Sequence, residues 1–153
     1  MTDSVYSIVY CSRNRIRGGH ETIRAELQSI LASCRANNAR MQVTGALLYN
    51  FGSFAQVLEG PLQSVESVFE KIQRDERHSE VTVVQSGMVE QRQFPDWSMA
   101  FASNSSIEGT PVATAAFDAV FAHAAGAGEQ MLSLMRELVI DEADWVLLEA
   151  AHA

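Results

Sequence analysis

The chain has 153 residues, 47% of them hydrophobic and 20% charged, and a formal net charge of −8. This length and composition predict one ordinary globular domain with a hydrophobic core and at most a short appendage. The acidic balance argues against a protein that binds nucleic acid through its phosphates. No apolar run reaches the roughly 18 residues that a membrane-spanning helix needs, so we expect no membrane contact.

The N-terminal stretch MTDSVYSIVYCSRNR contains an acidic residue and lacks the apolar core of a signal peptide. The two cysteines, Cys11 and Cys34, do not have the spacing of metal ligands. We therefore expect reduced, buried thiols and a cytoplasmic protein.

The first part of the chain predicts a strand, a loop and a helix. Residues 5–11, VYSIVYC, are apolar and β-branched or aromatic, which is typical of a strand. A polar loop with two glycines follows at 12–19. Apolar residues then recur at helical spacing over residues 21–36, so we predict a helix that ends near Asn37 and Asn38.

Four further strands and a second helix are expected before residue 102. Residues 42–50 and 53–59 predict strands joined by a tight turn, and therefore a hairpin. The Gly-Pro pair at 60–61 ends the hairpin and begins a helix, because proline is tolerated in the first helical turn. Residues 80–90 and 97–101 predict the fourth and fifth strands.

The order β-α-β-β-α-β-β predicts an α+β fold, the ferredoxin-like split βαβ arrangement with one additional strand. Both helices must then cover one face of the sheet. Residues 103–110 have the composition of a linker, and the proline at 111 suits the start of C-terminal helices. Met131 and Met135 lie on an apolar stripe of these helices, which packs on the other sheet face or forms an interface with a partner.

The motifs of common enzyme classes are missing. The sequence contains no G-x-S-x-G, H-E-x-x-H, P-loop or G-x-G-x-x-G, and we expect neither a metal site nor enzyme activity. The histidines are scattered over predicted loops and helices, and a surface position is the simpler interpretation for all four: His20, His78, His123 and His152.

A glutamine stands at a predicted core position in the third strand, GSFAQVLEG. Gln56 lies between Phe54 and Leu58 on one strand face, and burial of an amide without partners costs about 1–3 kcal/mol. Tyr10 of the first strand is a candidate partner for this amide. The pair either satisfies only itself within a plain core or belongs to a functional site.

Five stretches in a fixed order resemble the BLUF domains, blue-light sensors that bind flavin. They are IVYCS around Tyr10, NNARMQVTGALLY around Asn38, GSFAQVLEG around Gln56, RDERH at 74–78, and FPDWSMAF around Trp97 and Met99. Each stretch alone is weakly specific, whereas the ordered set is highly specific. The resemblance covers roughly residues 4–102 and implies a short single-domain type, with a photosensor domain at 1–102 and a helical output or interaction extension at 103–153.

The resemblance implies a role for each of five residues in flavin binding and photochemistry. Tyr10 matches the photoactive tyrosine, and Gln56 matches the glutamine that bridges this tyrosine and the flavin. Asn38 matches the asparagine that bonds the carbonyl edge of the isoalloxazine. Ile30 and Asn37 match positions that line the ring.

Further positions concern signal relay and the rim of the site. Trp97 and Met99 match the pair whose placement beside the glutamine changes during signalling. Lys71 matches a position where some relatives place an arginine near the flavin, although a solvated lysine on the helix surface explains it equally well. Arg77 and His78 match a family pattern, and we expect them at the end of the second helix rather than in the site.

The resemblance also implies a mechanism and a cofactor. Light makes the bound flavin a strong oxidant, an electron and then a proton move from Tyr10 through Gln56, and Gln56 stays rotated or tautomerised. A glutamine amide suits this role because one rotatable group carries two donors and an acceptor. FAD is the expected cofactor, with FMN and riboflavin as alternatives, because the ring-binding residues contact only the isoalloxazine.

The signal is then expected to pass through the fifth strand to residues 111–150. These residues would bind a downstream partner protein or a second copy of the chain, so we expect a homo-oligomer. The motivation is that no output enzyme follows residue 102. The alternative function is a small ferredoxin-like enzyme or a binding module that kept the scaffold without photochemistry.

Overall fold

The computed structural model describes residues 4–50, 52–95, 100–103 and 114–140. Within these residues the elements follow one another as β-α-β-β-α-β-β-α-α. The order expected for the first seven elements, and with it the ferredoxin-like α+β fold, is confirmed.

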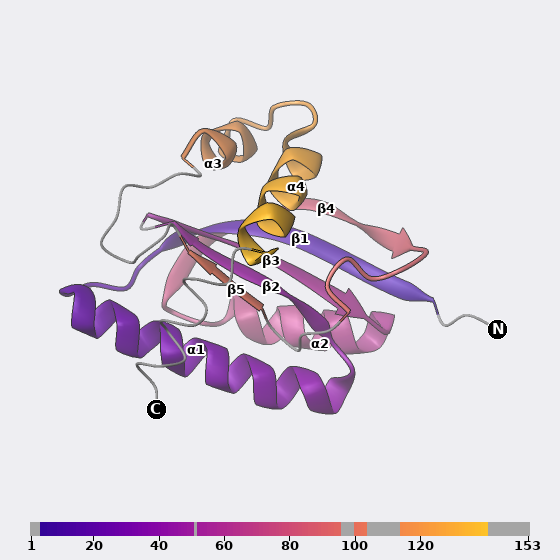
Figure 1. Cartoon of the computed structure of the whole chain (residues 1–153), viewed down its shortest axis with the longest axis horizontal. Coiled ribbons are helices and arrows are strands. Elements are labelled where there is room, and N and C mark those ends of the chain that lie inside the picture. Colours follow the sequence, from indigo (N-terminus) through magenta and orange to yellow (C-terminus); the bar gives the residue numbers. More distant parts are fainter. Residues whose placement is uncertain (1–3, 51, 96–99, 104–113, 141–153) are drawn as a thin grey trace.

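The described strands form one sheet in the order β4-β1-β3-β2-β5 (Figure 1). Neighbouring strands pair antiparallel except at one edge, where β5 runs parallel to β2. This arrangement places β1 and β3 in the middle of the sheet. The strands are β1 (Val5–Asn14), β2 (Thr44–Asn50), β3 (Ser53–Gly60), β4 (His78–Val89) and β5 (Ala100–Ser103).

The described helices cover both faces of this sheet. α1 (His20–Met41) and α2 (Leu62–Gln73) lie against one face, as expected, and α4 (Ala127–Ile140) crosses the opposite face beside α3 (Thr114–Phe121) (Figure 1). No helix within the described ranges is both long and apolar enough to cross a membrane.

β1 is longer than the sequence pattern indicates. Its pairing with β3 continues to Arg13 and its pairing with β4 continues to Asn14. Residues 12–14 therefore belong to the strand rather than to the predicted loop, because two neighbouring strands satisfy their backbone groups.

α1 is also longer, so the predicted helix end near Asn37 and Asn38 is wrong. The helix continues to Met41 and stops where Gln42 takes the left-handed conformation, with φ 62°. The Gln42 N–H then bonds the carbonyl oxygens of Ala39 and Asn38, a common way to close a helix C-terminus. Packing of α1 on the sheet outweighs the modest helix propensity of two asparagines.

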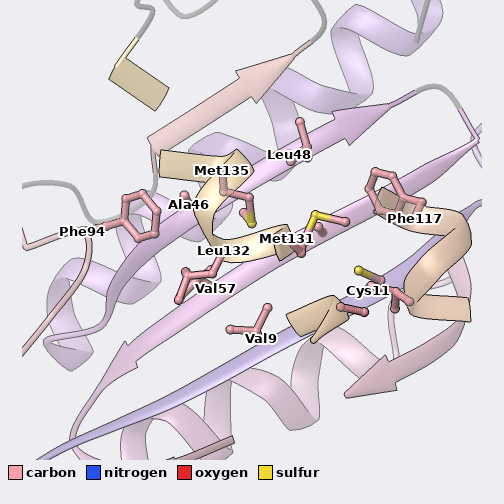
Figure 2. Packing of buried hydrophobic residues seen from close by; sticks show 13 residues of the cluster. Val9, Cys11, Ala46, Leu48, Val57, Phe94, Phe117, Met131, Leu132 and Met135 are labelled. Carbon is pink, nitrogen blue, oxygen red and sulfur yellow. The ribbon is translucent and has the colours of Figure 1, made fainter. Parts of the chain in front are cut away.

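The sheet carries a hydrophobic layer on each face, as strand alternation requires. Residues of α1 and α2 pack with Ile8, Leu47 and Leu58 on one face. On the other face, α3 and α4 pack on Val9, Ala46, Leu48 and Val57 (Figure 2), and their contributing side chains are Phe117, Val120, Met131, Leu132 and Met135. Met131 and Met135 are completely buried, so for these two residues packing on the sheet is confirmed.

β3 is buried along its whole length because helices cover both faces and strands flank both edges. Gly45 of β2 contributes to this packing. A Cβ atom at that position would lie 1.8 Å from the Val57 carbonyl oxygen, so only glycine permits the observed approach of β2 to β3.

Truncation of the α4 face should reveal how much it contributes to the core. We expect Met131→Ala to lower the free energy of unfolding by about 2–5 kcal/mol, because the removed atoms leave a cavity beneath α4. Urea denaturation measures this change. Leu62→Ala, at an exposed position of α2, is the control, and equal losses in the two variants would contradict burial of α4.

Candidate functional site

A cleft of about 220 Å³ is formed by α1, α2, the strands beneath them and the α2–β4 connection. It combines apolar walls with a small set of amide and charged groups, which is typical of small-molecule sites. Its lining residues are Tyr10, Ile30, Ser33, Cys34, Asn37, Asn38, Leu47, Phe54, Gln56, Val68, Lys71, Ile72, Asp75, Arg77 and His78. The residues singled out for photochemistry and cofactor binding, which come from β1, α1, β3 and α2, thus meet in one place.

Tyr10 and Gln56 face each other across the β1–β3 ladder. They are direct register partners, with 3% and 2% of their surfaces exposed, and the Tyr10 hydroxyl donates a hydrogen bond to Gln56 Oε1. Burial is the main cause that raises the pKa of Tyr10 well above its ordinary value. The phenol therefore keeps its proton at neutral pH and acts as the donor.

Gln56 has a second hydrogen-bonding neighbour, Cys34 of α1. Burial raises the pKa of the Cys34 thiol to about 11, although Arg77 and the hydrogen bond with Gln56 act in the opposite direction. Both cysteines are free, as expected, but Cys34 is only partly buried. The Gln56 amide is thus held between a phenol on β1 and a thiol on α1.

α1 supplies five residues to the cleft, Ser33 and the four that follow here. Ile30, Cys34, Asn37 and Asn38 follow at spacings of four, three and one, which places their side chains on the same side of the helix. Asn38 is almost completely buried. Asn37 is partly exposed, and its Oδ1 accepts a hydrogen bond of 2.5 Å from Arg40 Nη2.

Arg77 borders the cleft, so the expectation that it stays outside the site is wrong. It pairs with Asp75, at 2.6 Å between Nη2 and Oδ2, and reaches Glu26 of α1 at 3.5 Å. The hydrogen bond from Arg77 is the main cause that lowers the pKa of the Asp75 carboxyl. These contacts fold the α2–β4 connection back against α1, which brings its charged groups to the cleft.

His78 also lines the cleft and is half-buried, so neither its predicted exclusion from the site nor its predicted surface position is correct. Its Nδ1 lies 2.7 Å from Ser12 Oγ and its Nε2 lies 2.7 Å from the Ile72 carbonyl oxygen. Because a carbonyl only accepts, Nε2 must carry the proton. The ring meets Tyr10 edge to face at 6.1 Å.

The sequence did contain a signal for these two missed residues, the stretch RDERH. Whether this stretch is placed at the end of α2 or beside the cleft depends on the residue at which β4 begins. The strand starts at His78 rather than at residue 80, and His78 there pairs with Asn14 on the unforeseen extension of β1. Helix periodicity alone could not reveal that pairing.

Other predicted positions are less informative. Lys71 is exposed on α2 at the rim of the cleft, so both interpretations of it stay predictions. Trp97 and Met99 lie outside the described residues. His123 is exposed, and the described part of the chain holds no group of three His, Cys, Asp or Glu side chains suited to a metal ion.

The raised pKa of Tyr10 predicts a loss of stability at alkaline pH. The unfolded chain releases the phenolic proton near pH 10, whereas the native state retains it to higher pH. The contribution of Tyr10 is therefore complete below about pH 10 and declines as the pH rises towards the folded pKa. Unfolding free energies measured across this range should fall more steeply for the unmodified protein than for Tyr10→Phe, and parallel curves would contradict the assignment.

Comparison with known proteins relates this geometry to a family. Residues 5–100 match the BLUF family, which is described as sensors of blue-light using FAD. The photoactivated adenylate cyclase subunit beta of Euglena longa is 33% identical over 89 residues, which are 58% of this chain and 10% of that protein. The chain thus spans about a tenth of the length of the curated relatives it matches.

Solved structures agree with the family match. BlrB, described as a BLUF protein in its dark state, has a TM-score of 0.71 and 30% identity, over 92% of this chain and 99% of that one. A bacterial light-regulated adenylyl cyclase has a TM-score of 0.65 and 26% identity, over 88% of this chain and 40% of that one. Because the family match extends over more than half of the chain, and a buried tyrosine–glutamine pair lines its cleft, this chain belongs to the BLUF family of blue-light sensors.

Proposed function

We propose that the protein is a blue-light photoreceptor that holds the isoalloxazine ring of FAD in the cleft between α1, α2 and the sheet. The observation that carries this proposal is the buried hydrogen bond between Tyr10 and Gln56 at the cleft wall. The family description, which names a sensor rather than an enzyme, supports the same function.

The shape and chemistry of the cleft fit a flavin. A flat heteroaromatic ring needs apolar contacts on its faces and hydrogen-bonding groups at its polar edge. Ile30, Leu47 and Val68 supply apolar surface, and the amides of Asn38 and Gln56 supply the hydrogen-bonding groups. Asn37 would line the ring, and the ammonium group of Lys71 at the rim would favour an anionic cofactor tail.

The bound flavin would supply blue-light absorption and an excited state that accepts an electron. Tyr10 is the electron donor in our proposal, and its phenolic proton leaves along the hydrogen bond to Gln56 Oε1. The electron and the proton would then return to Tyr10, so that no net oxidation remains, and Gln56 would stay in a second hydrogen-bonding arrangement, by rotation or by tautomerisation of its amide. Such a rearrangement is possible because the amide has more than one partner, Tyr10 and Cys34, within reach.

FAD is the proposed cofactor because the family description names it. FMN and riboflavin carry the same ring and would satisfy the same cleft residues. Extraction of the chromophore followed by chromatography separates the three.

We propose that output leaves the photosensor domain, residues 1–102, through Trp97 and Met99 to the helical extension, residues 103–153. Relatives whose names describe light-regulated cyclases carry the sensor within much longer chains. In this chain the extension would bind a separate partner protein or a second copy. Hydrogen exchange of α4 in dark and lit samples tests this step, and identical exchange would contradict it.

Blue light should shift the absorption of the flavin-loaded protein reversibly to longer wavelength. We expect Tyr10→Phe to bind flavin but to lose the shift, because only the source of the electron and proton is removed. Gln56→Leu should lose the shift as well. Spectra before and after illumination measure both effects.

Tyr6→Phe is the matched control for this experiment. Tyr6 lies on the same face of β1 and does not line the cleft, so its variant should keep the full shift. A colourless protein that rejects added flavin would instead support a binding module without photochemistry.

Removal of the Asn38 amide should weaken flavin binding without abolishing it. One lost hydrogen bond of about 0.5–1.5 kcal/mol corresponds to a roughly 2–15-fold rise in Kd for Asn38→Ala. Titration of the apoprotein with FAD measures the change. Ser29→Ala, at an exposed position of α1 outside the cleft, is the control and should bind as the unmodified protein does.

A further inference from the structure

Glu59 is a fully buried carboxylate that the flavin cleft does not use. It belongs to β3, three residues after Gln56, and strand alternation turns it to the opposite face of the sheet, with Ala55 and Val57. Burial raises the pKa of its carboxyl, although backbone N–H groups and Arg92 oppose this effect. A charged group of this kind is costly to bury unless its hydrogen bonds are satisfied, so its partners are informative.

The partners of Glu59 are the backbone amides of the turn after β4. Gln93 N–H lies within 2.9 and 2.7 Å of the two carboxylate oxygens, and Phe94 N–H donates to Oε1 at 2.8 Å. Hydrogen bonds to an ionised acceptor are stronger than neutral ones. The carboxylate therefore fixes this turn directly onto the central strand of the sheet.

Arg92 of the same turn connects three further segments. Its Nη1 donates to Thr44 Oγ1 of β2 and to the Glu59 carbonyl oxygen, and its Nη2 donates to the Gln42 carbonyl oxygen, each at 2.9 Å. Gln42 closes α1, and its N–H bonds the Asn38 carbonyl oxygen within the cleft-lining part of that helix. A guanidinium at a helix C-terminus is also favoured by the helix dipole.

The turn reaches α4 on its other side. Gln93 Oε1 accepts a hydrogen bond of 2.8 Å from Arg136 of α4. The Phe94 ring is buried in the same hydrophobic cluster as Leu132 and Met135 of α4. Figure 2 shows Phe94 on the side of the cluster where these two residues lie. A displacement of the turn must therefore displace α4 or break these contacts.

The backbones at this place are also in direct contact. A Cβ atom at Gly60, the residue after Glu59, would lie 2.7 Å from the Gln42 carbonyl oxygen. The end of β3 and the end of α1 therefore cannot shift independently, because packed backbone leaves no slack. The two elements that hold Gln56 and Asn38 meet here.

We propose that Glu59 and Arg92 are positioning residues that couple the flavin cleft to α4 through the turn at Gln93 and Phe94. In this proposal a change at Gln56 or Asn38 alters the ends of β3 and α1. Arg92 and Glu59 transmit the change to the turn, and the contacts of the turn with Arg136 and of Phe94 with the α4 cluster transmit it to α4. The proposal rests on the proposed photoreceptor function and adds a route to α4 that is built from the described residues alone.

The test separates light detection from transmission in the same sample. Flavin-loaded protein is illuminated, the red shift is recorded, and hydrogen exchange of α4 is compared in dark and light. We expect Arg92→Lys to keep the red shift and to lose most of the light-dependent change in α4, by about threefold or more. Lysine keeps the positive charge but lacks the planar guanidinium that donates hydrogen bonds to three acceptors at once.

A second variant and a control protect the test against loss of folding. Arg136→Ala removes an exposed side chain of α4 and should reduce the light-dependent change while leaving the red shift intact. Arg74→Lys, in an exposed pair with Glu70 on α2, should behave as the unmodified protein in both measurements.

The outcomes distinguish the two proposals. A normal red shift with an undiminished α4 response in both Arg92→Lys and Arg136→Ala would overturn the coupling alone. A red shift without any α4 response in the unmodified protein would also overturn it. Absence of a red shift in the flavin-loaded unmodified protein would overturn the photoreceptor function, and the coupling with it.

Discussion

The hydrogen bond between the Tyr10 hydroxyl and Gln56 is the interaction on which the site depends. Both side chains are almost completely buried, so each polar group requires the other or an equivalent partner. The pairing requires that β1 and β3 keep their register, since a slip of one residue would turn Gln56 to the opposite sheet face. The antiparallel β1–β3 ladder, which lies in the middle of the sheet, therefore determines the geometry of the switch.

Burial of β3 on both faces gives this central strand two roles. Gln56 faces the cleft under α1 and α2, whereas Glu59 faces α4 and holds the turn after β4. The two side chains are three positions apart and therefore point to opposite faces. A strand of this kind can present a ligand-binding amide on one side and an anchoring carboxylate on the other within about 10 Å of chain.

The helices α3 and α4 pack on the second face of the sheet and cover it. Met131 and Met135 are as buried as any residue beneath α1, so displacement of α4 would expose apolar surface and cost free energy. If α4 were to leave the sheet, new contacts elsewhere would have to offset this free-energy cost. A small shift of the packed helix therefore costs less free energy than its complete displacement from the sheet.

Several features of this protein followed from the sequence alone because they depend on local pattern. Alternation in VYSIVYC and GSFAQVLEG identified two strands with Tyr10 and Gln56 facing one way, and the resemblance to BLUF domains identified Ile30, Asn37 and Asn38 as cleft residues. The structure places all of them around one cleft. Alternation identified the faces of Tyr10 and Gln56 because strand spacing determines which residues share a face. The resemblance, rather than periodicity, identified the residues of α1.

Tertiary structure alone decided the rest. The extension of α1 past Asn38, the entry of Arg77 and His78 into the cleft, and the burial of the α4 methionines all depend on contacts between segments far apart in sequence. The environment of Glu59 is of the same kind, because its partners lie more than thirty residues away. Spacing along a chain records which face a residue occupies, but what covers that face is determined only when the chain folds.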